Sequence, residues 1–398
     1  MYLINKVKLN SSLHQLRGKN KSDAPIDLSE FINKNLNEKK HSLSVLVDLR
    51  KAFDTVNHKI LLGKLERCGV RGLGLDWCRS YLSNRVQYVA INGKCSKKKP
   101  ISIGVPQGSI LGPIMFLIYI NDLCPTANYP KYTFFADDTT ITLADENFTN
   151  LINQTNSELE LVSQWAIHNR LTINADKTEC IVFSNREFSI SNSQIKMGSE
   201  YINFKNSCKF LGVFLDNKTS FSNHIDSICN KMTKSAGILY RINSSLTPQA
   251  RLSFYYSFVY PYLSYNISVW GSTHSYLLNS LFITQKRIVR NIDGSPYRAH
   301  TSPLFKKYSI LKVHDIFIYI VCCRMFKLRD DDCFRVNHNV NTRFRDMPRS
   351  SWQRLTMCQK AFSFTGPSEW NKLPESVRNI GRIGTFKRKM KEYLISKY

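Results

Sequence analysis

The chain has 398 residues, of which 42% are hydrophobic and 22% are charged, a composition typical of a soluble globular protein of two or three domains. The formal net charge at pH 7 is +26, and residues 281–398 alone hold 24 Lys and Arg against 9 Asp and Glu. Such an excess predicts a polyanionic partner, either nucleic acid or an acidic membrane surface, and the alternative is a basic face kept for solubility. The longest apolar run, Ile110 to Ile120, is too short to cross a membrane, and the N-terminus lacks a signal-peptide pattern.

The eleven Cys residues show neither a C-x-x-C pair nor a His-rich spacing, and the neighbours Cys322 and Cys323 do not easily bridge each other. A zinc site therefore has little support. We expect reduced thiols, packed as small hydrophobic side chains, in an intracellular protein that is not secreted.

In chain order, residues 25–40 are expected to form the first helix, because apolar side chains recur there at helical spacing. A short apolar strand, Val45 to Val47, follows and ends in Asp48. A carboxylate at the end of a buried strand can hold an ion outside the strand edge, or it can cap a helix. For the helix that contains Ile60 to Leu65, Asp54 is the better cap candidate because the helical run follows it at once.

The segment 85–93 alternates as a strand does and ends in Asn92-Gly93, a strong hairpin signal, with an exposed Lys97-Lys98-Lys99 just beyond. Pro106 and Gly108 then indicate a loop over residues 103–109. The loop leads into a helix over 110–122 that is apolar nearly all round and so is expected to be buried, with Ser109 as its cap. A glycine-rich loop before a helix is suited to bind a phosphate, although most such loops are only turns.

The stretch Tyr132 to Ile141 places two adjacent acids, Asp137 and Asp138, between two β-prone runs and predicts a hairpin with the acids at its tip. Acids in turns are common and usually only solvated. A hairpin this apolar should pack inside a domain, however, where two like charges would need cations such as Mg²⁺ or Mn²⁺. Both interpretations stay open at this point.

An amphipathic helix is expected over residues 150–170, and its apolar side includes Leu151, Leu159, Leu161, Val162 and Trp165. A loop and strand follow over 171–183, with Lys177 where they meet, and Phe210 to Asp216 predicts a tight hairpin. Residues from His224 to Leu239 mark a helix, and the rest of the chain is predicted to be mainly helical and basic.

Taken together, these segments resemble the reverse transcriptases of non-LTR, jockey-like retrotransposons. The matching segments are Val47-Asp48-Leu49 with Lys51-Ala52-Phe53-Asp54, Gly104 to Ser109 with Leu111-Gly112-Pro113, Phe135-Ala136-Asp137-Asp138, Lys177-Thr178, and Phe210-Leu211-Gly212. The similarity continues through Trp270-Gly271, Gln285-Lys286-Arg287, His300 to Phe305, Gly366-Pro367 and Trp370-Asn371. It therefore covers nearly the whole chain.

The resemblance implies an α+β fold of the right-hand polymerase type, with an antiparallel palm sheet and packed helices, incomplete fingers and a mainly helical thumb. It implies a fingers remnant at 1–40, a palm with part of the fingers at 41–215, a thumb-like region at 216–280 and a basic helical region at 281–398. In such palms the positions of Asp48 and Asp137 bridge two Mg²⁺ ions, with Mn²⁺ as an alternative, and Asp138 lies beside them. The primer 3′-hydroxyl attacks the α-phosphorus of a dNTP, one ion activating the hydroxyl and the other neutralising pyrophosphate.

Further roles follow by position. Leu49 would face the triphosphate, and Phe53 matches the aromatic gate that excludes a ribose 2′-hydroxyl, or else only packs beneath the helix. Gln107 and Gly108 would lie along the incoming nucleotide, and Lys177 matches the lysine proposed to protonate pyrophosphate. Phe210, Leu211 and Gly212 match the primer grip.

The implied partners are an RNA template, a DNA primer and dNTPs, without a membrane, in the nucleus or cytoplasm. The family's N-terminal endonuclease and the upstream arginine that holds the triphosphate have no counterpart in this sequence, so a shortened chain is expected, in which Arg17, Lys19 or Lys21 would be weak substitutes. The main alternative function is a remnant that only binds nucleic acid. An intron maturase and a viral RNA-dependent RNA polymerase fit less well, and the oligomeric state stays open.

Overall fold

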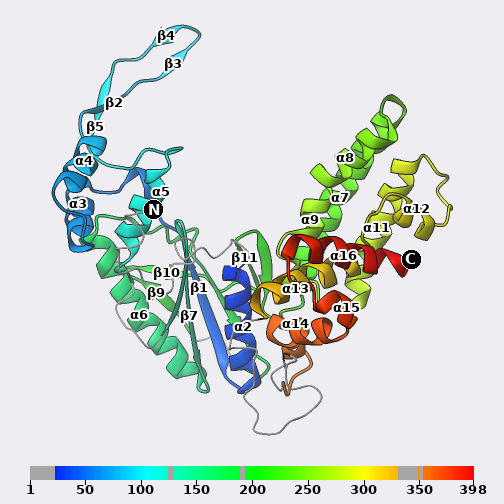
Figure 1. The fold of residues 1–398 in the computed structure, drawn as a ribbon. Helices are drawn as coiled ribbons and strands as arrows, with labels where there is room; N and C mark the ends of the chain where they lie inside the picture. The colour runs from blue at the N-terminus through cyan, green and yellow to red at the C-terminus, as the bar shows by residue number, and fades with distance from the viewer. Residues whose placement is uncertain (1–22, 124–129, 189–192, 330–347, 349–352) are drawn as a thin grey trace. The chain divides into compact units, whose positions relative to one another are not determined.

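The computed structural model describes residues 23–123, 130–188, 193–329, 348 and 353–398, and the first 22 residues, with Arg17, Lys19 and Lys21, lie outside them. The chain folds as two compact units (Figure 1): unit 1 contains Lys39–Leu211, and unit 2 contains Pro25–Glu38 and Gly212–Tyr398. No helix of the described part is long and apolar enough to span a membrane.

Unit 1 is built on an antiparallel sheet of four strands in the order β6-β7-β1-β8. The strands are β1 (His41–Val47), β6 (Lys131–Phe135), β7 (Asp138–Asp145) and β8 (Glu179–Phe183). Strand β1 pairs with β7 from His41–Asp145 to Val47–Thr139 and with β8 from Ser42–Phe183 to Leu46–Glu179. Six of the seven β1 residues are buried, which requires cover on both faces and fits their continuous apolar and small polar sequence.

Five helical segments belong to this unit: η1 (Ala52–Asp54), α3 (His58–Arg67), α4 (Leu73–Leu82), α5 (Leu111–Ile120) and α6 (Phe148–His168). The expected buried helix is α5, in which every residue from Met115 to Ile120 is buried. Helix α6 contacts β1 and β7, and its buried residues confirm the predicted apolar side at Leu151, Leu159 and Val162, whereas Trp165 is half-buried and Leu161 is 43% exposed. Ser109 accepts the N–H of Gly112 at 3.0 Å and so satisfies a donor in the first turn of α5, as expected.

The expected cap at Asp54 is wrong. Asp54 ends the short helix η1, and the cap of α3 is Asn57, whose side-chain oxygen accepts the N–H of Ile60 at 3.1 Å. The tight turn at η1 delays the start of α3 by several residues, so the acid nearest the helical run is not the residue at its terminus.

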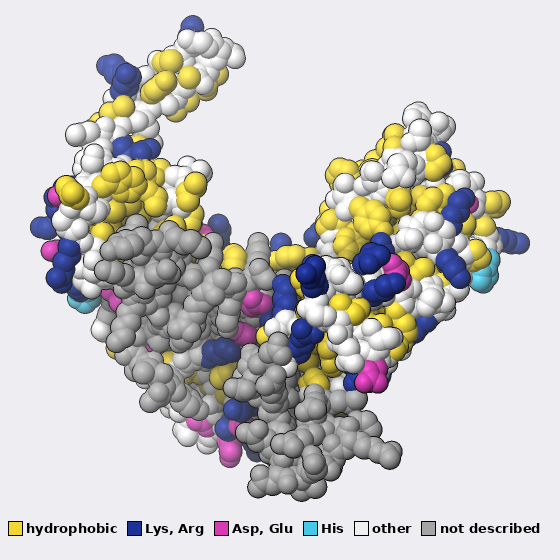
Figure 2. Space-filling view, viewed as in Figure 1, with side chains coloured by type: hydrophobic (Ala, Val, Ile, Leu, Met, Phe, Trp, Pro, Cys, Tyr) yellow, Lys and Arg dark blue, Asp and Glu magenta, His cyan; other side chains and the backbone are white. Residues whose placement is uncertain are grey.

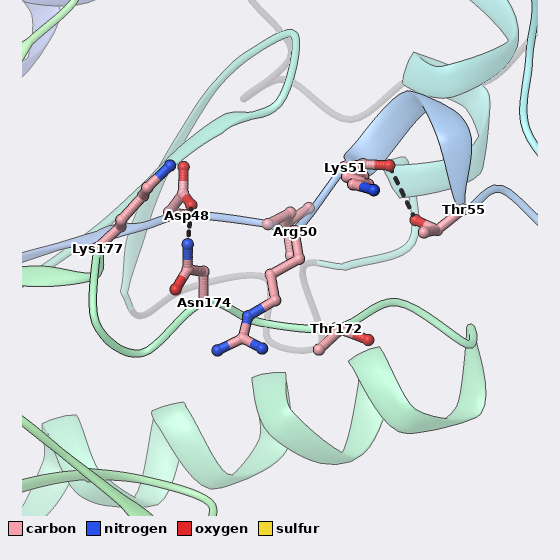
Figure 3. A pocket seen from close by; sticks show the side chains of 8 residues that line it. Asp48, Arg50, Lys51, Thr55, Thr172, Asn174 and Lys177 are labelled. Carbon is pink, nitrogen blue, oxygen red and sulfur yellow. Dashed lines mark hydrogen bonds between the residues drawn. The ribbon is translucent and has the colours of Figure 1, made fainter.

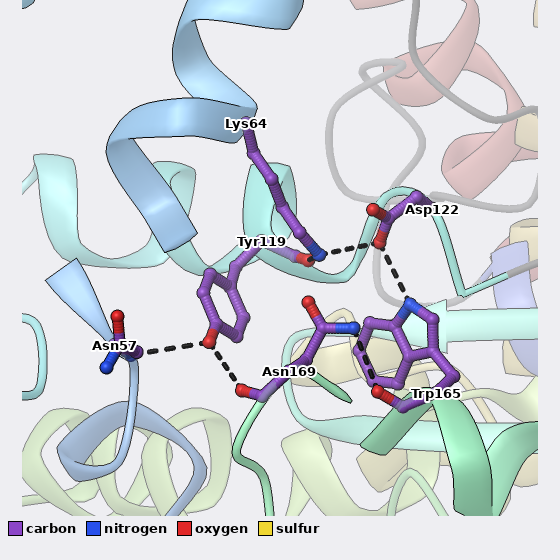
Figure 4. A network of polar contacts seen from close by, with 6 residues as sticks. All are labelled: Asn57, Lys64, Tyr119, Asp122, Trp165 and Asn169. Atoms are coloured by element: carbon purple, nitrogen blue, oxygen red, sulfur yellow. Dashed lines mark hydrogen bonds and ion pairs between the residues drawn. The ribbon is translucent and has the colours of Figure 1, made fainter. Parts of the chain in front are cut away.

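A buried polar network joins α3, α5 and α6 (Figure 4). The Lys64 ammonium, on a residue only 6% exposed, donates to the Tyr119 carbonyl at 2.6 Å and to the Asp122 carboxylate at 2.7 Å. The Trp165 indole donates to the same carboxylate at 3.0 Å, and the Tyr119 hydroxyl donates to the Asn169 carbonyl at 2.5 Å. Burial lowers the pKa of Lys64, and the hydrogen bond to Asp122 opposes that shift. Each buried donor of Lys64 and Tyr119 in this network thus has a partner, which fixes the three helices against one another.

Residues 85–101 form a long hairpin that extends beyond α4 (Figure 1); below we call it the arm. Its strands are β2 (Arg85–Gln87), β3 (Ala90–Ile91), β4 (Lys94–Cys95) and β5 (Lys99–Ile101). The predicted turn at Asn92-Gly93 is confirmed, with φ of 49° and 78°. Most arm side chains are exposed, Ile91 to 66% and Val89 to 62%. Unit 1 also holds β9 (Ile195–Met197), β10 (Glu200–Ile202) and β11 (Ser207–Phe210).

Unit 2 is mainly helical. Its elements are α2 (Asp23–Asn37), β12 (Val213–Asp216), α7 (Ser222–Ile242), η2 (Asn243–Ser245), α8 (Pro248–Phe258), α9 (Tyr260–Ser264), α10 (Ile267–Trp270), α11 (Ser275–Asp293), α12 (Ser302–Lys307), α13 (Val313–Leu328), η4 (Cys358–Lys360), α14 (Phe362–Asn371), α15 (Glu375–Arg378) and α16 (Ile383–Ser396). The predicted helix at 224–239 is confirmed as α7, although Ile238 is 51% exposed.

Long-range hydrogen bonds join α2 to the C-terminal part of unit 2. The Glu30 carboxylate accepts the N–H and the hydroxyl of Ser363 at 2.7 and 2.6 Å, and Asn37 accepts the N–H of Arg354 at 2.7 Å. The compact units therefore divide the chain differently from the predicted domains, which group residues 25–38 with an N-terminal fingers remnant.

Two buried polar side chains illustrate the packing of unit 2. Gln285 is fully buried and satisfied: its amide donates to Tyr255 at 2.9 Å and to the Leu311 carbonyl at 2.8 Å, and accepts from Val313 at 3.0 Å. His224 is 5% exposed, and burial lowers its pKa to about 4, so its ring is neutral at pH 7. Gln285, part of the motif by which the sequence resembles the family, thus has a structural role.

Candidate active site

The strand register brings the predicted acids to one edge of the sheet. The ladder between β1 and β7 ends at the pair Val47–Thr139, so Asp48, which follows Val47, and Asp138, which precedes Thr139, lie at the same end of the two strands. Residues opposite each other on antiparallel strands have Cβ atoms about 5 Å apart. Asp138 also pairs with Phe135 across the β6–β7 hairpin, which leaves Ala136 and Asp137 as its two-residue loop. Asp48 and Asp138, which are 90 residues apart in the sequence, therefore lie at the same end of the sheet as Asp137.

The expectation that the acid pair is buried is wrong. Tyr132 to Phe134 and Thr139 to Ala144 are buried, but Asp137 and Asp138 are exposed and Asp48 is half-buried. The ladder is covered by the core only as far as Thr139, and the tip continues beyond it into solvent. Because these acids are exposed, the free-energy cost of burying like charges gives no reason to expect a cation here.

The three acids have the type of ligand atom that Mg²⁺ requires. Mg²⁺ is held by a few carboxylate oxygens together with water and substrate phosphates, and Asp48, Asp137 and Asp138 supply hard oxygen ligands at one sheet edge. Among the described residues, no group of three or more His, Cys, Asp or Glu side chains lies together as a metal site. The carboxylate oxygens are therefore of the type that Mg²⁺ prefers, but the three side chains do not form a ready coordination cluster.

The turn that precedes β8 surrounds Asp48. The Asn174 amide donates to the Asp48 carboxylate at 2.9 Å, and the Asn174 N–H donates to the Asp48 carbonyl at 2.8 Å. The Thr178 hydroxyl accepts the N–H of Asp48 at 3.3 Å. A strand-like bridge between Leu49 and Ile173 continues these contacts. The sequence analysis did not identify Asn174, because it is polar and lies in a loop, as many structurally neutral residues do.

Lys177 lies in this turn, and Figure 3 shows its amine on the side where the Asp48 carboxylate lies. Both residues line a cavity of about 490 Å³, together with Leu49, Arg50, Lys51, Thr55, Thr172 and Asn174. Arg50 makes a long, exposed ion pair with Asp176 at 3.8 Å, which is worth little in water. The structure thus brings three predicted residues, Asp48, Leu49 and Lys177, to one opening.

The Pro-Gln-Gly loop borders a second cavity, of about 780 Å³, which also contacts η1 and the base of the arm. Its lining includes Gln107, whose amide donates to Asp54 at 2.8 Å. Gly104 adopts φ of 88°, and a Cβ there would approach the Asp54 carbonyl to 2.7 Å, so glycine is required at this close approach. Gly108, with φ of 78°, is exposed and lines neither of these two cavities.

Phe53 also lines neither of the two cavities. It is half-buried and stacks on Phe116 of α5, with ring centroids 4.6 Å apart. This contact accounts for an aromatic side chain here by packing alone, and its predicted role as a sugar gate stays a prediction.

The predicted primer grip lies at the boundary between the units. Phe210 and Leu211 are buried and end unit 1, while Gly212 begins unit 2. Leu211 and Gly212 have φ of 44° and 83°, a tight turn between β11 and β12. The role of these three residues as a primer grip stays a prediction.

Sequence comparison relates the chain to known proteins. Residues 4–215 match the family model of the reverse transcriptase, an RNA-dependent DNA polymerase. The RNA-directed DNA polymerase from the mobile element jockey of Drosophila melanogaster is 29% identical over 290 residues, covering 70% of this chain and 31% of that protein. A probable RNA-directed DNA polymerase from transposon BS of the same species is 25% identical over 304 residues, covering 72% and 33%.

The chain spans about a third of the length of these curated relatives. Among solved structures, telomerase from Candida albicans with a fragment of telomeric RNA aligns over 78% of this chain and 58% of that chain, at 15% identity and a TM-score of 0.38. At that TM-score the similarity supports no conclusion. The family match covers more than half of the chain and includes every strand of the four-stranded sheet. The chain therefore belongs to the reverse transcriptase family, and it is related to the enzymes of jockey-like, non-LTR retrotransposons.

Proposed function

We propose that this chain is an RNA-directed DNA polymerase, which adds dNTPs to the 3′-hydroxyl of a DNA primer on an RNA template. The observation that carries the proposal is the strand ladder that ends at Val47–Thr139, because it puts Asp48, Asp138 and the loop residue Asp137 at one end of the sheet. Membership of the reverse transcriptase family supports this class of reaction.

In this proposal unit 1 acts as palm and part of the fingers, and the helices that follow Gly212 in unit 2 act as the thumb. The buried ladder from β6 to β8 and the network around Lys64 make the palm rigid. A rigid support matters because transfer of a nucleotidyl group depends mainly on positioning and on stabilisation of charge.

The carboxylates of Asp48, Asp137 and Asp138 would hold the divalent ions. When bound, Mg²⁺ or Mn²⁺ supplies activation of the primer hydroxyl and neutralisation of charge on the phosphates. Asn174 keeps one Asp48 oxygen hydrogen-bonded at 2.9 Å and so limits the rotation of that carboxylate. Lys177 lines the same cavity as Asp48, which supports a role in donating a proton to the leaving pyrophosphate.

A second candidate function is nucleic-acid binding without polymerisation. It is favoured by the basic excess of residues 281–398, which hold 24 Lys and Arg against 9 Asp and Glu. Such binding would weaken strongly with salt and would not require the acids.

Primer extension separates the two functions. The assay uses an RNA template with an annealed DNA primer, dNTPs and Mg²⁺, and compares wild type with Asp137→Ala and with Asp76→Ala. Asp76 is an exposed acid of α4 that pairs with Arg79, three residues on, and serves as the matched control. We expect Asp137→Ala to abolish extension and Asp76→Ala to leave it unchanged. If Asp137→Ala extends primers as well as wild type, the polymerase assignment is wrong; if wild type binds the duplex without extending it, the second function is correct.

A further inference from the structure

We propose that Lys51 binds the phosphate oxygens of an incoming nucleoside triphosphate. This inference rests on the proposed polymerase function and adds a residue to it. The ligand class is a polyphosphate, and the site is the junction of the two cavities beside η1.

The first observation is the position of Lys51. The cavity that holds Asp48 and Lys177 and the cavity bordered by the Pro-Gln-Gly loop share two lining residues, Lys51 and Thr55. A triphosphate must connect the metal-binding acids with the part of the site that receives the sugar and base. Of the two shared residues, Lys51 is the one that carries a positive charge.

The second observation is the backbone of Lys51, which adopts φ of 46° and ψ of 47°. This left-handed conformation is favourable for glycine and costs other residues of order 1 kcal/mol. The Lys51 carbonyl holds the turn by accepting the N–H of Asp54 at 2.8 Å, the N–H of Thr55 at 3.1 Å and the Thr55 hydroxyl at 3.2 Å (Figure 3). These hydrogen bonds fix the Lys51 backbone, and with it the start of the side chain, beside both cavities.

The third observation is the charge around Lys51. Its side chain is exposed and makes no ion pair with the residues that the structure describes. The two cavities together also contain the cations Arg50, Lys177 and Arg85 and the acids Asp48 and Asp54. Asp54 is already hydrogen-bonded by Gln107, and Asp48 by Asn174, whereas the ammonium of Lys51 is free to bind a phosphate as a compact point charge.

The test uses inorganic tripolyphosphate and dTTP as probes, titrated calorimetrically into the full chain. Lys51→Gly removes the charge and suits the left-handed backbone, and Lys51→Arg keeps the charge. Lys39 is the matched control, since it is also an exposed lysine with a left-handed φ, of 64°, and lines neither cavity. We expect Lys51→Gly to bind both probes about tenfold more weakly, and Lys51→Arg and Lys39→Gly to bind as wild type does.

The inference is overturned if wild type does not bind tripolyphosphate, or if Lys51→Gly and Lys39→Gly bind it equally well. It is also overturned if Lys51→Gly loses affinity only for a primer–template duplex, because Lys51 then contacts a nucleic-acid backbone. Binding that depends on Lys51 in a chain that extends no primer would support the polyphosphate site and refute the polymerase. If Lys51→Gly extends primers with an unchanged KM for dNTPs, the polymerase function is supported and the polyphosphate site at Lys51 is refuted.

Discussion

Unit 1 contains two hairpins with two-residue loops that each begin at a positive φ, and their surroundings are very different. The loop of the β6–β7 hairpin begins with Ala136 at φ of 54°, and that of the arm begins with Asn92 at φ of 49°. The strands of the first hairpin are buried in the four-stranded sheet, whereas the arm leaves Ile91 and Val89 mostly exposed.

The difference shows that turn chemistry sets the reversal of the chain but not the position of the tip. The β6–β7 tip is held because β1 pairs with β7 along seven residues, so Asp137 and Asp138 stay at the end of the sheet where Asp48 follows β1. The arm has no third strand among the described residues. Its segment 85–101 carries five Lys and Arg and no Asp or Glu, and Figure 2 shows apolar and basic side chains together on its visible face. We therefore expect the first hairpin to serve chemistry and the arm to serve binding.

The largest expected contrast is in stability. Phe134 of β6 is fully buried, and Phe134→Ala should lower the free energy of unfolding by about 3–5 kcal/mol, through lost burial and a cavity. Ile91→Ala in the arm should change it by less than about 0.5 kcal/mol, because Ile91 is mostly exposed. Urea denaturation followed by circular dichroism measures both, and equal losses would show that the arm is packed after all.

The second contrast concerns RNA binding. Replacing Lys97, Lys98 and Lys99 by Gln should weaken binding of single-stranded RNA and lower the slope of log affinity against log salt by about 2, as expected when up to three phosphate contacts are lost. Fluorescence anisotropy across a salt series gives the slope, and the unfolding midpoint should not change because these side chains are exposed. An unchanged slope would mean that the arm does not contact the RNA.

The smallest contrast compares the two loops directly. Gly93 has φ of 78°, and a Cβ added there would meet no atom of the described residues within 4 Å, so Gly93→Ala should cost about 1 kcal/mol through backbone strain alone. Ala136→Gly relieves the same strain but adds freedom to the unfolded chain, so the change should stay within about 1 kcal/mol of zero. Thermal unfolding of both variants tests this, and a large loss in Ala136→Gly would show that the Ala136 methyl group packs at the tip.

Several site residues could be predicted from sequence, and others could not. The strand before Asp48, the Asp137-Asp138 turn and the loop before α5 follow from local patterns, and the structure has them. The burial of the acids was predicted wrongly, because the apolar flanks end one residue short of the tip. Asn174, which donates to the Asp48 carboxylate from 126 residues away, carries no local signal, and the sequence does not show that Thr178 contacts Asp48 from 130 residues away.

The sequence by itself determined the order of elements, the basic excess and the family, because each depends on residue types and on short spacings along the chain. The tertiary structure alone decided which acids share an edge, that Asn57 rather than Asp54 caps α3, and that Lys51 lies between two cavities. These features depend on hydrogen bonds and packing between segments far apart in the chain. No local pattern encodes which distant partner a strand or a turn will meet.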